Sequence, residues 1–167
     1  LSLSRLEEGN IEPEPGVFDL PGLTEEVRQE MQLVAKPGQV IITDLNCLSN
    51  QIFSDRRLYR NILINLISNA IKFSPENKNI FIGCEINQSR IVLTVQDQGI
   101  GIPEEDQFHL FERFFRGKNV TNIQGTGLGL NIVSRYVDIL NGKVDFSSKL
   151  EEGTVFKISF PRLEIPV

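Results

Sequence analysis

Three asparagines and one lysine recur at helical spacing within a single apolar segment: Asn61, Asn65, Asn69 and Lys72. Residues three and four apart lie above one another on an α-helix, so these side chains would form one polar stripe. Asparagine is a poor helix former, and an ordinary solvent-facing stripe would more naturally contain Glu and Lys. A polar face or a buried amide network explains the stripe without chemistry. The chemical alternative is that amide oxygens bind Mg²⁺ and the lysine binds phosphate.

A carboxylate and two glycines follow a second apolar run, in the order Asp97, Gly99, Gly101. A carboxylate at the end of a strand can accept a hydrogen bond from the exocyclic amine of adenine, and glycines let the backbone approach a purine ring. A turn closed by an Asx cap explains the same residues. A Rossmann loop is excluded, because Pro103 lies in the region of the third glycine of that motif and no strand-turn-helix of the required order follows.

A glycine-rich run opens the third segment: Gly125, Thr126, Gly127, Leu128, Gly129 and Leu130. A helix that starts here would present backbone N–H groups and the positive end of its dipole to an anion. The run lacks the Lys-Ser/Thr pair of a Walker loop, and a simple glycine hinge is the alternative.

Upstream, aromatic and basic residues alternate over 111–118. They form either a core-facing cluster or the anchor of a mobile loop whose Arg116 or Lys118 reaches a triphosphate.

Periodicity and turn residues predict the elements that must position these groups. The long helix is expected to begin after Ser54 or Asp55 and to end near Phe73, before Ser74-Pro75. The paired runs 79–87 with 90–96, and 143–147 with 154–160, each predict an antiparallel hairpin. Helices are also expected over 21–35 and 127–140, and short strands over 17–20, 40–44 and 51–53. We therefore expect one mixed sheet covered by helices on one face.

Composition bounds the class of protein. With 167 residues and 40% apolar content, the chain suits one domain. A net charge of -5 gives no electrostatic signal for nucleic-acid binding, which needs clustered cations to neutralise phosphates, and we expect no nucleic-acid partner. Cys47 and Cys84 lack metal-ligand spacing, so we expect free thiols. No apolar run approaches the roughly 20 residues that span a bilayer. We expect a cytoplasmic fragment that makes no membrane contact of its own. A membrane anchor in another part of the parent protein is compatible with this expectation.

Taken together, the four segments resemble the GHKL ATPase superfamily and, within it, the catalytic domains of two-component sensor histidine kinases. Residues 61–74 look like the N box of that family, 97–102 like its G1 box, 111–116 like its F box and 125–130 like its G2 box. Gly153 and Thr154 resemble its last glycine motif. The resemblance implies a Bergerat fold, an α/β (α+β) two-layer sandwich. Its sheet would be mixed and largely antiparallel, with helices on one face and a flexible ATP lid over about residues 103–126.

The resemblance also implies a role for each candidate residue. Asn69 would bind Mg²⁺, with Asn65 nearby, and Lys72 would contact the phosphates of ATP. Asp97 would accept the adenine amine. The remaining nucleotide contacts would come from Gly99, Gly101, Ile102, Arg116, Lys118, Gly125, Thr126, Gly127, Leu128, Gly129, Leu130 and Thr154. Catalysis would depend on Asn61, Asn65, Lys72 and Arg116.

One position departs from the family pattern. Asn61 stands where many members carry Glu, and an amide cannot take up a proton at neutral pH. This departure favours transfer of phosphate to histidine over hydrolysis of ATP.

The expected function is therefore transfer of the γ-phosphoryl group to a histidine on a separate phosphoacceptor/dimerisation domain, with a response regulator receiver domain downstream. The only histidine here, His109, is expected to be structural. Residues 1–13 would be the end of a dimerisation helix and a linker, and 14–167 the catalytic domain. Another GHKL ATPase, or a non-catalytic nucleotide-binding pseudokinase module, is the alternative.

Overall fold

The computed structural model describes residues 11–111 and 129–167. The described elements follow one another as β1 (Gly16–Asp19), α2 (Leu20–Gln32), β2 (Val40–Cys47), β3 (Gln51–Ser54), α3 (Arg56–Phe73), β4 (Asn79–Ile86), β5 (Arg90–Gln96), the 3₁₀-helix η1 (Glu104–His109), α4 (Gly129–Ile139), β6 (Lys143–Lys149) and β7 (Gly153–Pro161). The predicted long helix and both predicted hairpins are confirmed. The predicted helix over 127–140 is confirmed for its described part.

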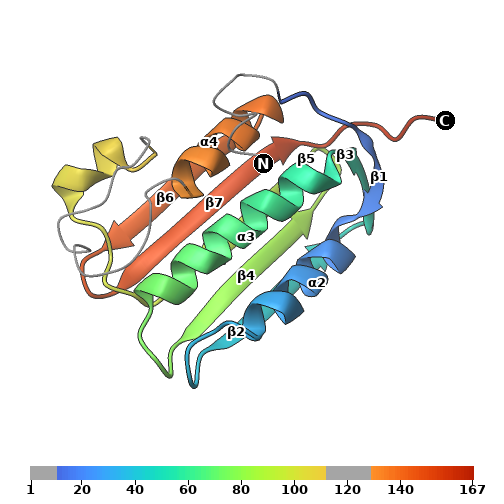
Figure 1. Cartoon of the computed structure of the whole chain (residues 1–167). Coiled ribbons are helices and arrows are strands. Elements are labelled where there is room, and N and C mark those ends of the chain that lie inside the picture. Colours follow the sequence, from blue (N-terminus) through green and yellow to red (C-terminus); the bar gives the residue numbers. More distant parts are fainter. Residues whose placement is uncertain (1–10, 112–128) are drawn as a thin grey trace.

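Five of the described strands form one sheet in the order β2-β4-β5-β7-β6. β2 pairs with β4 in parallel, while the other neighbouring strands pair antiparallel. Helices α2, α3 and α4 lie side by side across one face of this sheet (Figure 1). Their buried apolar side chains pack against inward residues of the strands to form the core. The expected two-layer sandwich with a mixed, largely antiparallel sheet is confirmed.

The expectation of a single sheet is wrong for the first and third strands. β1 and β3 pair with each other, antiparallel, in a separate two-stranded sheet in which Val17 lies opposite Phe53. Each of these strands has four residues. An apolar run this short indicates a strand but carries no information about its partner. The pairing is decided by where α2 and α3 place the two segments.

Helix α2 ends three residues before the predicted boundary, at Gln32 instead of Ala35. Continued apolar periodicity suggested the longer helix, but Leu33 and Val34 are 86% and 64% exposed. The Gln32 side chain donates to the carbonyl of Gln39 (2.8 Å) and accepts from the backbone N–H of Ile41 (2.9 Å). These bonds turn the chain from α2 towards β2.

Helix α3 has strong caps at both ends. At its start, the buried Asp55 carboxylate accepts from the backbone N–H groups of Arg57 and Leu58, which confirms Asp55 as the N-cap. At its end, the buried Gln39 amide donates to the carbonyls of Ile71 and Ser74. The ammonium group of Lys36 donates to the carbonyls of Lys72 (2.8 Å) and Ser74 (2.9 Å). The last turn of α3 is therefore fixed by the segment between α2 and β2.

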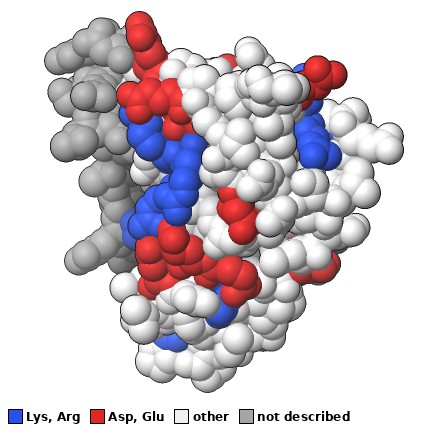
Figure 2. Space-filling model, turned by 90° about the vertical axis from the view of Figure 1, so that its right-hand side faces the viewer, with Lys and Arg blue, Asp and Glu red and all other residues white. Residues whose placement is uncertain are grey.

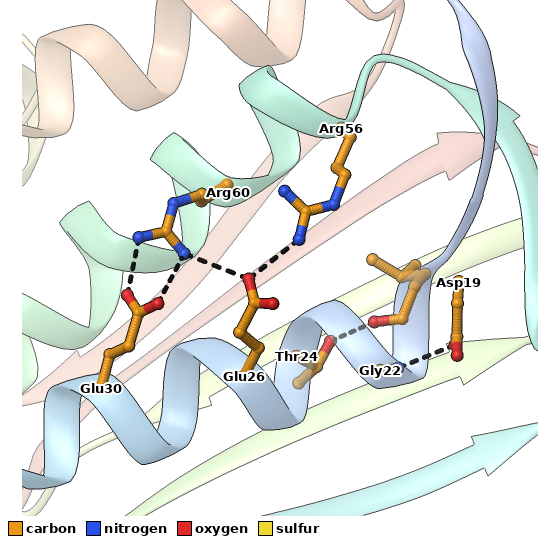
Figure 3. A network of polar contacts seen from close by, with 8 residues as sticks. Asp19, Gly22, Thr24, Glu26, Glu30, Arg56 and Arg60 are labelled. Atoms are coloured by element: carbon orange, nitrogen blue, oxygen red, sulfur yellow. Dashed lines mark hydrogen bonds and ion pairs between the residues drawn. The ribbon is translucent and has the colours of Figure 1, made fainter.

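Ion pairs join α2 to α3 along their exposed sides. Arg60 pairs with Glu30 at 2.6 Å, and Arg56 pairs with Glu26 at 2.8 Å (Figure 3). Arg60 also approaches Glu26, at 3.5 Å. At the end of the molecule where α3 begins, Figure 2 shows a band of basic side chains between groups of acidic ones. Such exposed pairs are each worth about 0–1 kcal/mol, so they align the helices more than they stabilise the core.

Candidate functional site

The polar stripe of α3 faces the first residue of α4. Asn61, Asn65 and Asn69 are half-buried and Lys72 is exposed. A Cβ on Gly129 would lie 3.2 Å from Asn65 Oδ1 and 3.8 Å from Asn69 Oδ1. Both amide oxygens therefore point towards a position where glycine leaves room. The polar side chains separated by four residues are brought together as the sequence predicted, and α4 forms the opposite wall.

Asn61 takes part in the stripe through its backbone. The Asn65 Nδ2 group donates to the Asn61 carbonyl oxygen over 2.7 Å. This bond fixes the amide plane of Asn65 and leaves its Oδ1 directed at Gly129. The nitrogen and oxygen of an amide side chain are assigned from their hydrogen-bond partners. The atom of Asn65 that faces the Asn61 carbonyl must be a donor, and it is therefore the nitrogen.

Asp97 lies directly after β5, at 8% exposure. Its Oδ1 accepts from the backbone N–H of Gly99 (2.9 Å) and of Thr154 (3.2 Å). Within the described residues no hydrogen bond ends on Oδ2. Burial raises the pKa of Asp97, because a charged carboxylate loses its hydration, and the two N–H donors oppose this effect. A buried carboxylate with one unengaged oxygen is a strong acceptor for a ligand N–H group.

The turn after Asp97 packs against the β6–β7 turn. The Ile100 N–H group donates to the carbonyl of Phe73 at the end of α3 (3.2 Å), and the Glu151 N–H group donates to the Ile100 carbonyl (2.7 Å). Gly101 has φ +75°, and a Cβ there would lie 2.2 Å from the Lys149 carbonyl oxygen. Only glycine meets both conditions. The Phe73 bond also connects the asparagine stripe to the Asp97 turn.

Thr154 and Ser148 complete the surroundings of Asp97. Thr154 is 5% exposed, and its hydroxyl lies 2.8 Å from that of Ser148 on the neighbouring strand. The Ile102 N–H group donates to Ser148 Oγ over 2.8 Å. Ser148 was not among the residues predicted from the sequence. The available signal was alternation in β6, where Val144, Phe146 and Ser148 are half-buried and the residues between them are exposed.

The first described part of the predicted lid contains a short helix that the sequence did not predict. Residues 104–109 form η1, too short a helix for periodicity to reveal. Gln107 Nε2 donates to the Ile102 carbonyl over 3.2 Å. Asn131 Nδ2, near the start of α4, donates to the Phe111 carbonyl over 3.1 Å. Asn131, also not predicted, thus holds residue 111 beside α4.

Several expected ligands lie outside the described residues: Arg116, Lys118, Gly125, Thr126, Gly127 and Leu128. The expected end of the dimerisation helix and most of the lid also lie outside the described residues. Gly129 and Leu130 are described as the first turn of α4. Gly129 lies beside the stripe, at a helix N-terminus, where backbone N–H groups are able to meet an anion.

The donor set of this site suits a hard cation bound together with phosphate. In residues 11–111 and 129–167, no three His, Cys, Asp or Glu side chains gather as a metal site. The converging groups are instead the amide oxygens of Asn65 and Asn69, beside the gap that Gly129 leaves. Mg²⁺ prefers oxygen ligands, keeps several waters, and commonly completes its shell with substrate phosphates. The two amides therefore fit a magnesium ion carried by a nucleotide.

A family model described as "Histidine kinase-, DNA gyrase B-, and HSP90-like ATPase" matches residues 54–164, from just before α3 to just after β7. That range holds both the amide stripe and the Asp97 turn. The chain belongs to this ATPase family. Relatives of this ATPase domain include the circadian input-output histidine kinase CikA of Synechococcus elongatus, 32% identical over 96% of this chain and 22% of CikA. The histidine-protein kinase ArlS of Staphylococcus aureus is 32% identical over 83% of this chain and 32% of ArlS.

Solved structures resemble the ATPase domain as well. Full-length ShkA in complex with AMPPNP has a TM-score of 0.81 and 28% identity, and the match covers 94% of this chain and 33% of ShkA. The mycobacterial sensor histidine kinase MprB has a TM-score of 0.73 and 25% identity, over 93% of this chain and 99% of that chain. These matches identify the domain as a GHKL catalytic domain of the sensor histidine kinase type, an ATP-binding module of two-component signalling.

The ATPase domain spans between a fifth and a third of the length of the CikA and ArlS relatives. None of the helices within the described ranges is long and apolar enough to cross a membrane.

Proposed function

We propose that this domain binds Mg-ATP and transfers the γ-phosphoryl group to a histidine on the phosphoacceptor/dimerisation domain of its parent kinase. One observation carries the proposal: α3 presents two amide oxygens to the start of α4, and the end of the same helix is bonded to the turn that holds Asp97. On this proposal, a base acceptor and a phosphate cradle would form neighbouring walls of one site.

At the adenine end, Asp97 would accept the exocyclic amine of the base through Oδ2. Its two backbone bonds already engage Oδ1 and fix the carboxylate plane. Gly101 and Ile102 would let the ring lie against the backbone, and Thr154 would reach the base through a water molecule. A hydrogen bond from an amine to a charged acceptor is worth about 1.5–3 kcal/mol, enough to select the base.

At the phosphate end, Asn69 would hold Mg²⁺ through Oδ1, Asn65 would support it, and Lys72 would place its ammonium charge on the phosphates. The magnesium ion would supply neutralisation and orientation of the triphosphate. The N–H groups at the start of α4 add the positive end of a helix dipole. Arg116, Lys118 and the run from Gly125 to Leu130 are proposed as further phosphate contacts from their sequence positions alone.

In the transfer step, a neutral imidazole nitrogen of the acceptor histidine would attack the γ-phosphorus, forming an N–P bond as the bond to the β-phosphate oxygen breaks. The protein acts through positioning and charge, because phosphoryl transfer asks for little covalent help. Asn61 cannot act as a general base, but its carbonyl anchors Asn65. An imidazole needs no deprotonation before it attacks, whereas water benefits from a base. The site therefore favours histidine over water as the acceptor.

The proposal extends to partners and organisation. Residues 14–167 would form the catalytic domain, and 1–13 the linker from a dimerisation helix. The phosphorylated partner domain would pass its phosphate to a response regulator receiver domain. We propose a cytoplasmic location, with no contact of this domain to nucleic acid or membrane.

The test is a calorimetric titration with AMPPNP, with and without Mg²⁺, followed by incubation with ATP and a matching dimerisation domain. Binding should require Mg²⁺ and should weaken at least tenfold in Asn69→Ala, since one ligand of the cation is lost. Asn46→Ala, which removes an exposed asparagine of β2, is the matched control and should bind normally. Absence of binding would refute the proposal, as would acid-labile phosphate on His109. Binding without transfer in trans would instead identify a pseudokinase module.

A further inference from the structure

Ser148 lies where three backbone segments around Asp97 meet, although no motif assigns it a role. Its Oγ accepts from the Ile102 N–H group at 2.8 Å and donates to the Gly153 carbonyl at 3.2 Å. The same oxygen lies 2.8 Å from the hydroxyl of Thr154, which is its direct partner across the β6–β7 pair. One hydroxyl therefore joins the turn after β5 to the start of β7.

We propose that Ser148 is a positioning residue that sets the preference of this site for adenine over 6-oxopurines. The inference rests on the proposed function, because it concerns the same nucleotide site. Ser148 would act through Thr154, whose N–H group also bonds Asp97 Oδ1 over 3.2 Å. Thr154 thus carries the hydroxyl that Ser148 orients, and its backbone N–H group holds the carboxylate that accepts the base amine.

The proton count of the hydroxyl pair explains how Ser148 can control the site. Ser148 Oγ receives the Ile102 proton and has one proton of its own to give. When that proton goes to the Gly153 carbonyl, Thr154 must donate to Ser148 and faces the site with lone pairs only. When it goes to Thr154 Oγ1, the proton of Thr154 becomes available to the site. The contacts therefore allow both a donor form and an acceptor form of Thr154.

The edge of the purine ring selects between these forms. Adenine carries an amine donor at C6 and an unprotonated N1, whereas a 6-oxopurine carries a carbonyl oxygen at C6 and a proton on N1. Asp97 accepts from the adenine amine, and N1 then requires a donor. The donor form of Thr154 supplies it, directly or through one water molecule. A 6-oxopurine instead turns its oxygen towards the Asp97 carboxylate, which repels it.

The experiment compares Mg-ATP with Mg-ITP, which differ at this edge of the base, in calorimetric titrations of Ser148→Ala. This variant removes the partner that orients the Thr154 hydroxyl and leaves the Ile102 N–H group without its acceptor, so ATP binding should weaken roughly three- to tenfold. ITP binding should be unchanged, so the ATP/ITP affinity ratio should fall by the same factor. Ser147→Ala is the matched control, because Ser147 is the neighbouring serine on the exposed side of β6 and should leave the ratio intact.

A second pair of variants separates hydrogen bonding from packing. Ser148→Thr keeps the hydroxyl and should retain the affinity ratio, whereas Ser148→Val matches threonine in shape and should lose it. This pair decides the question if the alanine variant does not fold. Equal losses for ATP and ITP, or an unchanged ratio in Ser148→Val, would overturn the role of Ser148. Failure of the unmodified domain to bind ATP would remove the proposed function and this inference with it.

Discussion

Replacing Asp97 with asparagine should separate nucleotide binding from folding. The asparagine oxygen can keep both bonds that Oδ1 now accepts, from Gly99 and Thr154. The amide nitrogen then stands where Oδ2 would receive the adenine amine. Two donors would face each other, and the bond to a charged acceptor would be lost. That bond is worth about 1.5–3 kcal/mol, so the affinity for AMPPNP should fall by about 10- to 150-fold.

Folding stability should respond in the opposite direction. Burial raises the pKa of Asp97, so the native state holds the proton more tightly than the unfolded chain does. The carboxylate therefore costs no stability below its unfolded pKa of about 3.9. The cost develops as pH rises through the higher pKa of the folded state. At neutral pH Asp97→Asn should be as stable as the unmodified domain or more stable, and this difference should shrink on acidification.

The two halves of this prediction need two assays. Calorimetric titration with Mg-AMPPNP measures the affinity, and urea unfolding at neutral and at acidic pH measures the free energy of unfolding. Asp44→Asn, an exposed aspartate of β2, is the control and should change neither quantity. The reasoning is refuted if Asp97→Asn binds the nucleotide as well as the unmodified domain. It is also refuted if the variant loses more than about 1 kcal/mol of stability at neutral pH.

Three further substitutions test how the site is held. Gly101→Ala places a Cβ 2.2 Å from a backbone carbonyl oxygen at a residue with φ +75°. Calorimetry should therefore show weaker nucleotide binding, and a melting scan should show a lower Tm. Gly16→Ala is the control and should change neither quantity, because nothing lies within 4 Å of the added Cβ. Asp55→Ala should cost about 1–2 kcal/mol in urea unfolding at neutral pH, because α3 loses its N-cap. Burial alone would raise the pKa of Asp55, but hydrogen bonds from Arg57 and from backbone N–H groups lower it below the value in the unfolded chain. The Asp55 carboxylate therefore stabilises the fold above the unfolded pKa, and this stabilisation is lost as pH falls through the pKa of the folded state. Gln39→Leu should cost about 1–3 kcal/mol in the same assay, because carbonyls at the end of α3 lose a buried donor; an unchanged unfolding midpoint would contradict the proposed cap.

The sequence was informative about elements with strong local signals. Helix α3 was predictable because Asp55 is a strong N-cap, apolar residues follow at helical spacing, and Pro75 ends the run. Both hairpins were predictable because their strands follow each other closely along the chain. The predicted end of α2 was wrong because Leu33 and Val34 continue the apolar pattern, although both side chains face solvent. Local periodicity cannot report a competing bond such as that between Gln32 and Gln39.

The candidate site followed the same division. Asn65, Asn69 and Asp97 could be identified from residue type and spacing, because one short segment contains each signal. For Ser148 the alternation of β6 indicates only which face of the strand it occupies, and its role depends on Thr154 lying opposite it. The Gln39 cap on α3 was equally invisible, because donor and acceptors are more than thirty residues apart.

The sequence alone determined which chemical groups the domain carries, their order, and the helix that aligns the amides, since helical spacing depends on neighbours along the chain. The tertiary structure alone decided which distant segments meet. It placed Gly129 against Asn65 and Asn69, the Ile100 N–H group on Phe73, and the pairing of β1 with β3. The physical reason is that the backbone and side-chain groups in these contacts are satisfied across the fold, where no local pattern records the partner.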